Sequence, residues 1–410
     1  MRIQIVALNY APELTGSGQT IAARAAYLAR AGHQVDVVAG FPHYPEWRVH
    51  GSYRRRPYQS EVIDGVQVLR CWHHVPSRSY SAGRALIEAS FGLTALAAHR
   101  LPKPDVTLGS MPILSNGLAA WLIAKRHRVP FGLFVQDLSA RAAKQSGMRG
   151  AEVLAGPAEQ VEAFLARRAD RIAIIAEGFR APLLDYGARP ESLQRVPNFT
   201  LVSPPSIPRA EVRARLGWPQ DRPVVLHSGN MGYKQALEHL VEAARIAQEA
   251  GSPVEFVLVG DGNQRVLLQD LVARHQLSNV RFMPLQDEAI FPSMLGAADV
   301  LVLSQRATVT DMSLPGKLST YLASGRPVVA ALHEASETAR ELRRAGADCI
   351  VEPDDPPALL AAIDALLGDS DRAAAMGERG QRFALDEFAP SRIEAALDGF
   401  IKGLVASPLA

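Results

Sequence analysis

Two stretches of this sequence combine a short apolar strand, a glycine-containing turn and an amphipathic helix. One runs from Arg2 to Val38 and continues into a second apolar strand, and the other runs from Val224 to Ala244. A strand, a helix and a second strand in this order form a βαβ unit, which places both strands in a parallel sheet. The pattern therefore predicts a doubly wound α/β fold, with one such unit in each half of the chain.

The same alternation continues along the chain on both sides of a proline-rich segment, residues 197–208, which we interpret as a linker. A length of 410 residues fits two domains. We therefore predict two Rossmann-like domains, residues 1–200 and 201–388, with a ligand in the cleft between them. Further strands are predicted at residues 106–108, 131–135, 172–175, 256–259, 280–282, 300–303, 328–330 and 349–351.

Composition excludes several classes of protein. A formal net charge of +2 gives no reason to expect nucleic acid as a partner. The two cysteines, Cys71 and Cys349, lie far apart in the sequence, which fits a reducing compartment. The first apolar run is short and contains Gln4, so we read it as a strand and not a signal peptide. No apolar run reaches the roughly 18 residues of a membrane span. We expect a cytoplasmic protein.

The turn from Gly229 to Lys234 predicts an anion site. It joins a buried-type strand to a helix, so free N–H groups and the positive end of the helix dipole would face a ligand above the strand. Lys234 adds a full positive charge. The glycine and lysine spacing is not that of a Walker A loop. The alternative is an ordinary strand–helix turn with a surface lysine.

A glycine-rich loop near the N-terminus, with Gly16 and Gly18, is the second candidate for an anion site. One interpretation is a dinucleotide-binding fingerprint with Asp36 as the ribose acid. Two features weaken it: Ile21 occupies the place of the third glycine, and the glycines come several residues after the strand. A long glycine loop still suits a bulky anionic ligand, because glycine lets the backbone approach closely.

Several motifs together resemble glycosyltransferase family 4, and within it the colanic acid and exopolysaccharide enzymes of the WcaI type. They are NYAPELTGSGQT, FPHYPEW, SGNMGYKQALEHLVEAA, LVGDG, RFMPLQ and LPGKLSTYLASGRPVVA. The resemblance extends from Arg2 to about Phe388. It implies a retaining enzyme with the GT-B fold, a nucleotide-sugar donor and a glycan precursor as acceptor. It also implies that the last helix, residues 390–404, returns to the N-terminal domain.

The resemblance also implies roles for individual residues. The donor phosphates would contact Gly16, Gly18, Gly229, Asn230, Lys234, Gly316 and Lys317. The nucleotide and its ribose would contact Gly260, Asp261, Pro284, Leu285 and Thr320. The chain departs from the family at two glutamate positions, which hold Met312 and Thr320, and at an arginine position, which holds Asn230. Asp311, beside Met312, is the acid that would replace the first glutamate.

The family's implied mechanism is front-face substitution, in which the leaving phosphate takes the proton of the acceptor. Lys234 and Asp311 are then candidates for catalysis. Asp137 is the third candidate, because it follows a buried strand and would lie at the ligand edge of the sheet. The alternative for Asp137 is a helix N-cap.

An aromatic and basic segment in the N-terminal half is the candidate acceptor side. It holds His43, Tyr44 and Trp47, followed by Arg54–Arg56. We predict contact with a glycan or polyprenyl-linked acceptor and peripheral contact with the inner membrane, helped by residues 84–100. The alternatives are a solvated loop and a core helix.

No metal or cofactor is expected, and the UDP- or GDP-linked sugar is a substrate. The sequence Asp369-Ser370-Asp371 has the form of a D-x-D metal motif, but its place between two predicted helices favours helix capping. Two other functions stay open from the sequence. One is a nicotinamide-dependent oxidoreductase that uses Gly16, Gly18 and Asp36, and the other is a catalytically inactive nucleotide-sugar-binding paralogue.

Overall fold

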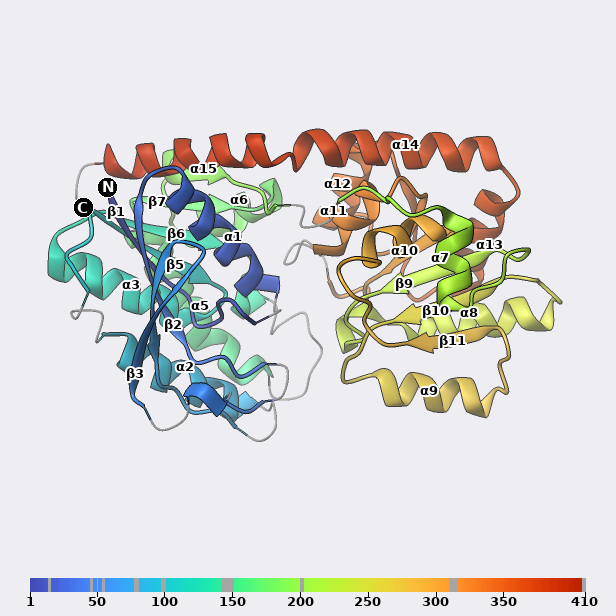
Figure 1. The fold of residues 1–410 in the computed structure, drawn as a ribbon, viewed down its shortest axis with the longest axis horizontal. Coiled ribbons are helices and arrows are strands. Elements are labelled where there is room, and N and C mark those ends of the chain that lie inside the picture. Colours follow the sequence, from blue (N-terminus) through green and yellow to red (C-terminus); the bar gives the residue numbers. More distant parts are fainter. Residues whose placement is uncertain are drawn as a thin grey trace. The chain divides into compact units, whose positions relative to one another are not determined.

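The computed structural model describes residues 1–13, 16–44, 47–49, 51–53, 56–76, 81–96, 101–141, 151–199, 203–309 and 316–407. It divides the chain into two compact units. Unit 1 comprises Met1–Phe199 and Ser391–Ala410, and unit 2 comprises Thr200–Pro390. Each unit is built around a sheet with the alternation of strands and helices that the sequence predicted, so the doubly wound α/β class is confirmed (Figure 1).

Unit 1 holds an eight-stranded sheet in the order β3-β4-β2-β1-β5-β6-β7-β8. Its strands are β1 (Arg2–Val6), β2 (Gln34–Gly40), β3 (Tyr58–Ile63), β4 (Val66–Cys71), β5 (Val106–Met111), β6 (Phe131–Val135), β7 (Arg171–Ile174) and β8 (Leu193–Arg195). The prediction of a parallel sheet is wrong at one edge, because β3 pairs antiparallel with β4. Asp64 and Gly65 join these two strands with positive φ angles of 50° and 79°. An Asp-Gly pair between two strands is a hairpin signal, and it was overlooked.

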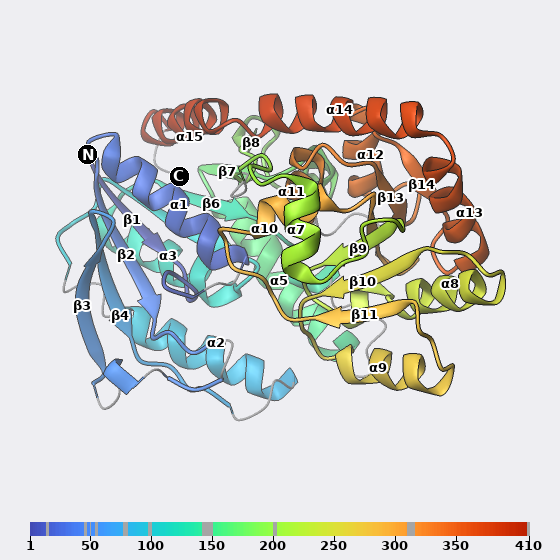
Figure 2. The ribbon, with the colours of Figure 1, turned by 45° about the vertical axis from the view of Figure 1, so that its right-hand side comes forward.

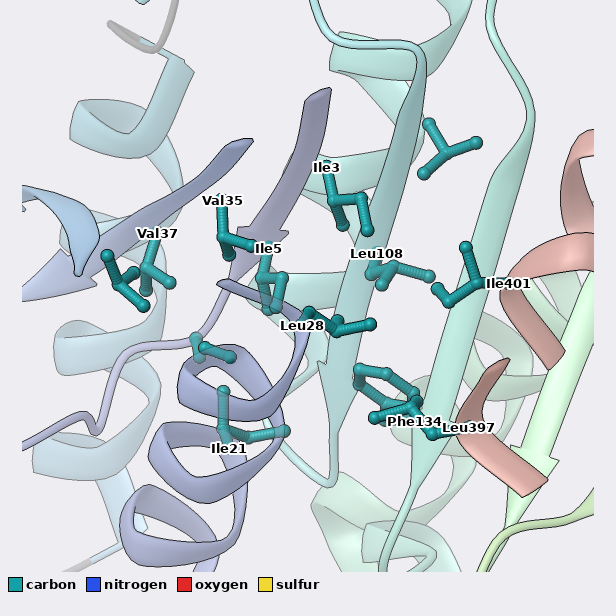
Figure 3. Close-up of a cluster of buried hydrophobic side chains, with 14 of the residues drawn as sticks. Ile3, Ile5, Ile21, Leu28, Val35, Val37, Leu108, Phe134, Leu397 and Ile401 are labelled. Carbon is teal, nitrogen blue, oxygen red and sulfur yellow. The ribbon is translucent and has the colours of Figure 1, made fainter. Parts of the chain in front are cut away.

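The helices of unit 1 cover both faces of this sheet. They are α1 (Gly16–Arg30), α2 (Ser81–Ala95), α3 (Leu114–His127), α5 (Ala151–Arg168), α6 (Arg180–Asp185) and α15 (Pro390–Val405), with 3₁₀ turns η1 (Gly51–Tyr53), η3 (Glu177–Phe179) and η4 (Pro190–Ser192). In Figure 3, Ile21 and Leu28 of α1 lie with Leu397 and Ile401 of α15 against side chains of the central strands. Two segments from opposite ends of the chain therefore complete one core.

Helix α15 is fixed to unit 1 by packing and by a hydrogen bond. The rings of Phe400 and Phe134, a residue of β6, lie 5.6 Å apart between centroids. Gly132 gives this helix room, because a Cβ there would lie 3.0 Å from Leu404 Cδ2. Gln194 donates from Nε2 to the carbonyl oxygen of Ala396 at 2.8 Å. The last helix of the chain is thus part of the hydrophobic core of unit 1.

Unit 2 holds a six-stranded parallel sheet in the order β11-β10-β9-β12-β13-β14. Its strands are β9 (Val224–Ser228), β10 (Glu255–Val259), β11 (Val280–Met283), β12 (Val300–Ser304), β13 (Val328–Ala331) and β14 (Cys349–Val351). The chain order reverses between β9 and β12, which lie side by side. In open parallel sheets this switch point, at the carboxyl ends of the strands, is where ligands bind.

The helices of unit 2 include the helix α8 that the sequence predicted after β9. They are α7 (Arg209–Leu216), α8 (Glu238–Glu249), α9 (Arg265–Arg274), α10 (Phe291–Ala297), α11 (Gly316–Ala323), α12 (Glu337–Arg344), α13 (Pro356–Leu367) and α14 (Ser370–Glu387), with the 3₁₀ turn η5 (Tyr233–Gln235). Helix α8 packs on α13, and α11 packs on α14 (Figure 2). Because α8 follows β9 and α11 follows β12, both helices begin beside the switch point.

We expect Phe400→Ala to destabilise unit 1 strongly. It removes a fully buried ring that contacts β6, and such truncations cost about 3–5 kcal/mol. Urea unfolding followed by tryptophan fluorescence measures the loss. Val405→Ala is the control, because Val405 lies on the same helix and is 45% exposed. Equal midpoints for the two variants would show that α15 is not part of the core.

Candidate active site

Three glycines let the turns after β9 and β10 run in direct backbone contact. Gly229, Gly260 and Gly262 have φ angles of 127°, 135° and 158°. A Cβ on Gly260 would lie 2.0 Å from the carbonyl oxygen of Gly229. Met231 N–H donates to the carbonyl oxygen of Asp261 at 2.8 Å, which joins the two turns. No side chain fits at these contacts, so the glycines are a structural requirement at this edge of the sheet.

Lys234 lies in the 3₁₀ turn between β9 and α8, and it is partly exposed. Its ammonium group has no hydrogen-bond or ion-pair partner within the described ranges. Arg306, just past β12, holds the turn from the other side. Its N–H donates to the carbonyl oxygen of Lys234 at 3.0 Å, and its guanidinium lies 3.8 Å from the ring centroid of Tyr233. The lysine therefore stands on a fixed backbone with a free charge.

The helix after this turn begins later than the sequence indicated. Ala236 adopts a left-handed conformation and ends the 3₁₀ turn, and α8 starts at Glu238. Glu238 lies in the first turn of the helix and pairs with Arg306. This carboxylate already interacts with the positive end of the helix dipole. A ligand at Lys234 would share this helix end with Glu238, and the predicted contribution of the helix end to a ligand stays a prediction.

Lys317, in the first turn of α11, lies across Gly229. A Cβ on Gly229 would come 2.6 Å from Lys317 Cε. The amine nitrogen Nζ is 3.2 Å from Nε2 of His227, a fully buried residue of β9. Burial lowers the pKa of Lys317 to about 7, and burial and then the charge of Lys317 lower the pKa of His227 well below its usual value. His227 was overlooked, although a histidine inside an apolar strand was the available signal.

Helix α11 is anchored to β9 by Tyr321. The buried hydroxyl accepts from Ser228 N–H at 2.7 Å and donates to the carbonyl oxygen of Ser228 at 3.1 Å. Gly316, the first residue of α11, is exposed. The Thr320 hydroxyl donates to the carbonyl oxygen of Lys317 at 2.9 Å, so its proton is used within the helix. Its oxygen keeps a lone pair for the predicted ribose contact.

The remaining nucleotide-side candidates follow the neighbouring strands. Asp261 accepts from Gly262 N–H through Oδ1 at 2.8 Å, which is the bond of a turn aspartate. Pro284 and Leu285 come directly after β11, and both are exposed. Asn230 lies between Gly229 and Met231, and its carbonyl oxygen is 3.5 Å from Lys317 Nζ. These candidates therefore lie at the carboxyl ends of β9, β10 and β11.

Some predicted residues lie outside the described residues. They are Asp311, Met312, Arg54 and Arg55. Arg56 is described and exposed.

In unit 1, the predicted glycine loop is the start of a helix. Helix α1 begins at Gly16, and Gly18 is buried in its first turn without a positive φ. The anion site at this helix end stays a prediction that rests on the positive end of the helix dipole. Ile21 is fully buried in the core, and Asp36 lies near the start of β2, paired with Arg2 at 3.2 Å. Asp36 is thus far from the carboxyl end where a ribose acid belongs.

A buried carboxylate organises the acceptor-side candidates. Glu13 accepts from the N–H groups of His43 and Tyr44 at 2.6 and 2.9 Å. His43 Nδ1 lies 3.1 Å from Glu13 and 3.3 Å from His73 Nε2. Burial alone would raise the pKa of Glu13, but the hydrogen bonds and charge of His43 and the bond from Asn9 bring it below the usual value. Burial and the charge of His43 lower the pKa of His73 to about 4.

This network fixes the orientation of His43. The Glu13 carboxylate and the Phe41 carbonyl oxygen both face Nδ1, so Nδ1 carries a proton. Trp47 packs edge-on against His43 and Tyr44, with ring centroids 6.0 and 6.3 Å away. Tyr44 is 43% exposed. The structure therefore brings His43, Tyr44 and Trp47 together, with Glu13 as a member that the sequence did not reveal.

Asp137 follows β6 and is partly exposed. Its Oδ1 accepts from Leu138 N–H at 2.9 Å. Glu162 of α5 is 2% exposed and accepts from Ala140 N–H at 3.3 Å. Burial raises the pKa of Glu162 to about 7, and the negative charge of Asp137 raises it further. Hydrogen bonds from Ala140, Ser139 and Tyr186 lower this pKa but do not offset burial. Asp137 therefore has a buried acidic neighbour that the sequence did not predict.

The comparisons with known proteins agree with this architecture. A model described as "Glycosyl transferase 4-like domain" matches residues 15–198, and one described as "Glycosyl transferases group 1" matches residues 222–369. A putative colanic acid biosynthesis glycosyl transferase, WcaI from Escherichia coli (strain K12), is 30% identical over 88% of this chain and 91% of its own length. The chain belongs to the family 4 type of glycosyltransferases.

Two further similarities support the fold and the family. A GDP-mannose-dependent alpha-mannosyltransferase from Mycobacterium tuberculosis (strain CDC 1551 / Oshkosh) is 28% identical over 80% of this chain and 79% of its own length. The crystal structure of Anabaena Alr3699/HepE in complex with UDP-glucose has a TM-score of 0.72 at 16% identity, covering 98% of this chain and 99% of that one. The glycosyltransferase therefore has the GT-B fold.

The acidic pairs near the C-terminus of this glycosyltransferase cap helices. Asp369 accepts from Arg372 N–H at 3.0 Å at the start of α14, and Asp355 accepts from Ala358 N–H at 2.9 Å at the start of α13. Asp371 lies in the first turn of α14. Within the described ranges, no group of three or more acidic, histidine or cysteine side chains is placed to hold a metal ion.

Glu162→Gln should remove a pH dependence from the stability of this enzyme. The folded-state pKa of about 7 lies above that of an unfolded glutamate, so the stability that Glu162 contributes is complete below about pH 4.5 and is lost as the pH rises through 7. Above pH 7 the charged form costs about 3 kcal/mol. Urea unfolding at pH 5 and pH 8 gives the free energy of unfolding of both proteins. Relative to wild type, the variant should be more stable at pH 8 than at pH 5. The same difference at both pH values would contradict the shifted pKa.

Proposed function

We propose that this glycosyltransferase is a retaining hexosyltransferase that moves a sugar from a UDP- or GDP-linked donor to a polysaccharide or lipid-linked glycan precursor. The observation that carries the proposal is the pair of lysines at the switch point of unit 2. Lys234 follows β9 and Lys317 follows β12, so both stand where open parallel sheets bind ligands. Two of the similar proteins are named with UDP-glucose and GDP-mannose, which supports a nucleotide-sugar donor.

The mechanism is front-face substitution with the charge on the leaving group stabilised by the protein. As the bond from sugar to diphosphate breaks, negative charge develops on the phosphate oxygens, and one of them takes the acceptor's proton. Lys234, the Gly229–Asn230 turn and the start of α11 at Gly316 supply positive charge and N–H donors. Gly260, Asp261, Pro284, Leu285 and Thr320 surround the nucleotide. Asp311, which lies outside the described residues, is the acid that we expect to act on the donor sugar.

The reaction needs no metal and no further cofactor. Lysine and helix N-termini take the role that a divalent cation has in other phosphate chemistry. In unit 1, the positive end of α1, with Gly16 and Gly18, faces the donor phosphates, and Asp137 positions the acceptor.

The acceptor binds on the side of His43, Tyr44 and Trp47. Two exposed or partly exposed aromatic rings offer apolar faces to a sugar ring. Glu13 keeps the His43 ring oriented through Nδ1, and Nε2 of the ring is then available for a hydrogen bond with the acceptor. A glycan or polyprenyl-linked precursor fits such a surface.

We predict that Lys234→Met lowers kcat/KM for the donor by about 10²–10³, because it removes a free charge where the leaving group becomes negative. Release of UDP from UDP-glucose or of GDP from GDP-mannose measures the rate. Lys402→Met is the matched control, since Lys402 lies exposed on α15. Wild-type kinetics in Lys234→Met would overturn the phosphate role.

The same assay tests the class of reaction. EDTA should leave the rate unchanged, and the proton NMR spectrum of the product should show the anomeric configuration of the donor. An inverted product, or activity that depends on Mg²⁺ or Mn²⁺, would contradict the proposed mechanism. No turnover with any nucleotide sugar would favour an inactive paralogue.

We also propose peripheral contact with anionic membranes through unit 1. Helix α2 buries Ile87 and Phe91 but exposes Leu86 and Leu93. No helix in the described part of the chain is long and apolar enough to span a bilayer. We expect flotation with anionic vesicles at low salt, because each basic residue near the surface contributes about 1 kcal/mol and salt screens it. The double substitution Leu86→Ser and Leu93→Ser should weaken flotation, because it removes the exposed apolar side chains. If wild type floats with neutral vesicles and not with anionic vesicles, basic residues do not contribute to the contact.

A further inference from the structure

The Lys317 side chain is held in one place by three elements of unit 2. It starts in the first turn of α11, crosses the bare backbone of Gly229 and ends beside His227 of β9. The φ of 127° and the missing side chain at Gly229 make this path possible, because a Cβ there would meet Lys317 Cε at 2.6 Å. Tyr321 ties α11 to the end of β9. The amine is thus fixed at the switch point, next to the turn that carries Lys234.

The partners of this amine are neutral. His227 Nδ1 lies 3.4 Å from the carbonyl oxygen of Val302, so Nδ1 carries the proton and Nε2 accepts from Lys317 Nζ. The other partner is the carbonyl oxygen of Asn230 at 3.5 Å. Two weak neutral acceptors do not compensate a buried ammonium group, whose charge is costly without an opposite charge. Burial accordingly lowers the pKa of Lys317 to about 7.

The charged groups around this site are few. The turn after β9 carries Lys234, which is a cation. Glu238 of α8 is paired with Arg306, which follows β12. The first turn of α11 carries no acidic residue. Asp311 belongs to the segment before α11, outside the described residues. No described carboxylate is paired with Lys317.

We propose that Lys317 binds the donor diphosphate as a proton-coupled ligand: it takes up a proton from solvent when the diphosphate arrives, so that donor binding and protonation of Lys317 are linked. The inference rests on the proposed nucleotide-sugar donor. Lys317 Nζ accepts the proton with its lone pair and becomes an ammonium ion paired with phosphate oxygens. His227 stays neutral and accepts one N–H of the Lys317 ammonium through Nε2. The N–H that is left without a protein acceptor then faces the ligand.

The sign of the pH dependence follows from linkage. The pKa of Lys317 is about 7 in the free enzyme and rises beside a diphosphate, so the bound state holds more protons above pH 7. Donor affinity is then greatest below pH 7 and falls above it. With a bound-state pKa well above the range tested, Kd rises about 16-fold between pH 7 and pH 8.5.

The first test follows the amine itself and needs no ligand. The chain has six lysines, so reductive methylation with ¹³C-formaldehyde gives a simple NMR spectrum. Lys317→Arg identifies the Lys317 resonance by its loss. We expect this resonance to titrate near pH 7. Titration of Lys317 near pH 10 would overturn the inference whether or not any nucleotide binds.

The second test measures proton uptake by calorimetry with UDP-glucose and GDP-mannose. Their diphosphates are diesters without the phosphate ionisation near pH 6, so they add no proton of their own. In buffers of different ionisation enthalpy we expect uptake of about 0.9 proton per site at pH 8 and about 0.1 at pH 6. Lys317→Arg should bind without uptake, because arginine is always charged. Lys234→Met should bind more weakly and keep the uptake.

The outcomes separate the inference from the proposed function. Binding of a donor with no net uptake at pH 8, or equal uptake in wild type and Lys317→Arg, overturns proton coupling and leaves the donor assignment intact. Failure of both donors to bind at any pH contradicts the proposed donor, and the NMR titration then decides the state of Lys317 alone. His227→Asn, which keeps an acceptor at this point, is the second variant if Lys317→Arg does not fold.

Discussion

The contact between the backbones of Gly229 and Gly260 is the constraint on which the ligand edge of unit 2 depends. A Cβ at Gly260 would lie 2.0 Å from the Gly229 carbonyl oxygen, closer than any two such atoms can approach. The two turns therefore form one rigid surface, in which Met231 bonds to Asp261. Because no side chain rises from this surface at Gly229, Lys317 can lie flat across it. Tyr321 and Arg306 then fix the neighbouring helix and turn by hydrogen bonds to main-chain atoms.

Unit 1 reaches a comparable rigidity with buried polar side chains. Asn116 of α3 accepts from Leu8 N–H at 3.0 Å and donates to the Ser110 carbonyl oxygen at 2.8 Å, so it joins the ends of β1 and β5. Arg70, fully buried, bonds to Glu61 and to the carbonyl oxygens of Gly40 and Ala11. Each satisfied network specifies one loop conformation, because a broken member would leave a buried polar group without a partner. The glycines of unit 2 achieve the same end by excluding side chains.

Features that depend on local sequence could be predicted, and features that depend on contacts between distant residues could not. Apolar periodicity located most strands, the helices that follow them and the linker near residue 200, since these depend on local pattern. Lys234 and the capping role of Asp369 also follow from local features. Glu13, Glu162 and His227 could not be assigned, because their roles depend on contacts between residues distant in sequence. The late start of α8 was missed because the left-handed Ala236 is an unusual conformation that its sequence does not signal.

The two lysines at the switch point differ in a way that matters for catalysis. Lys234 is partly exposed and without a partner in the described structure. Lys317 is held against a buried neutral histidine, where a permanent ammonium group would bear the cost of burial without an opposite charge. A permanent, uncompensated ammonium group at Lys317 would destabilise the free enzyme. A lysine that gains its charge together with the diphosphate avoids this cost and still provides two cations when the leaving group develops its charge.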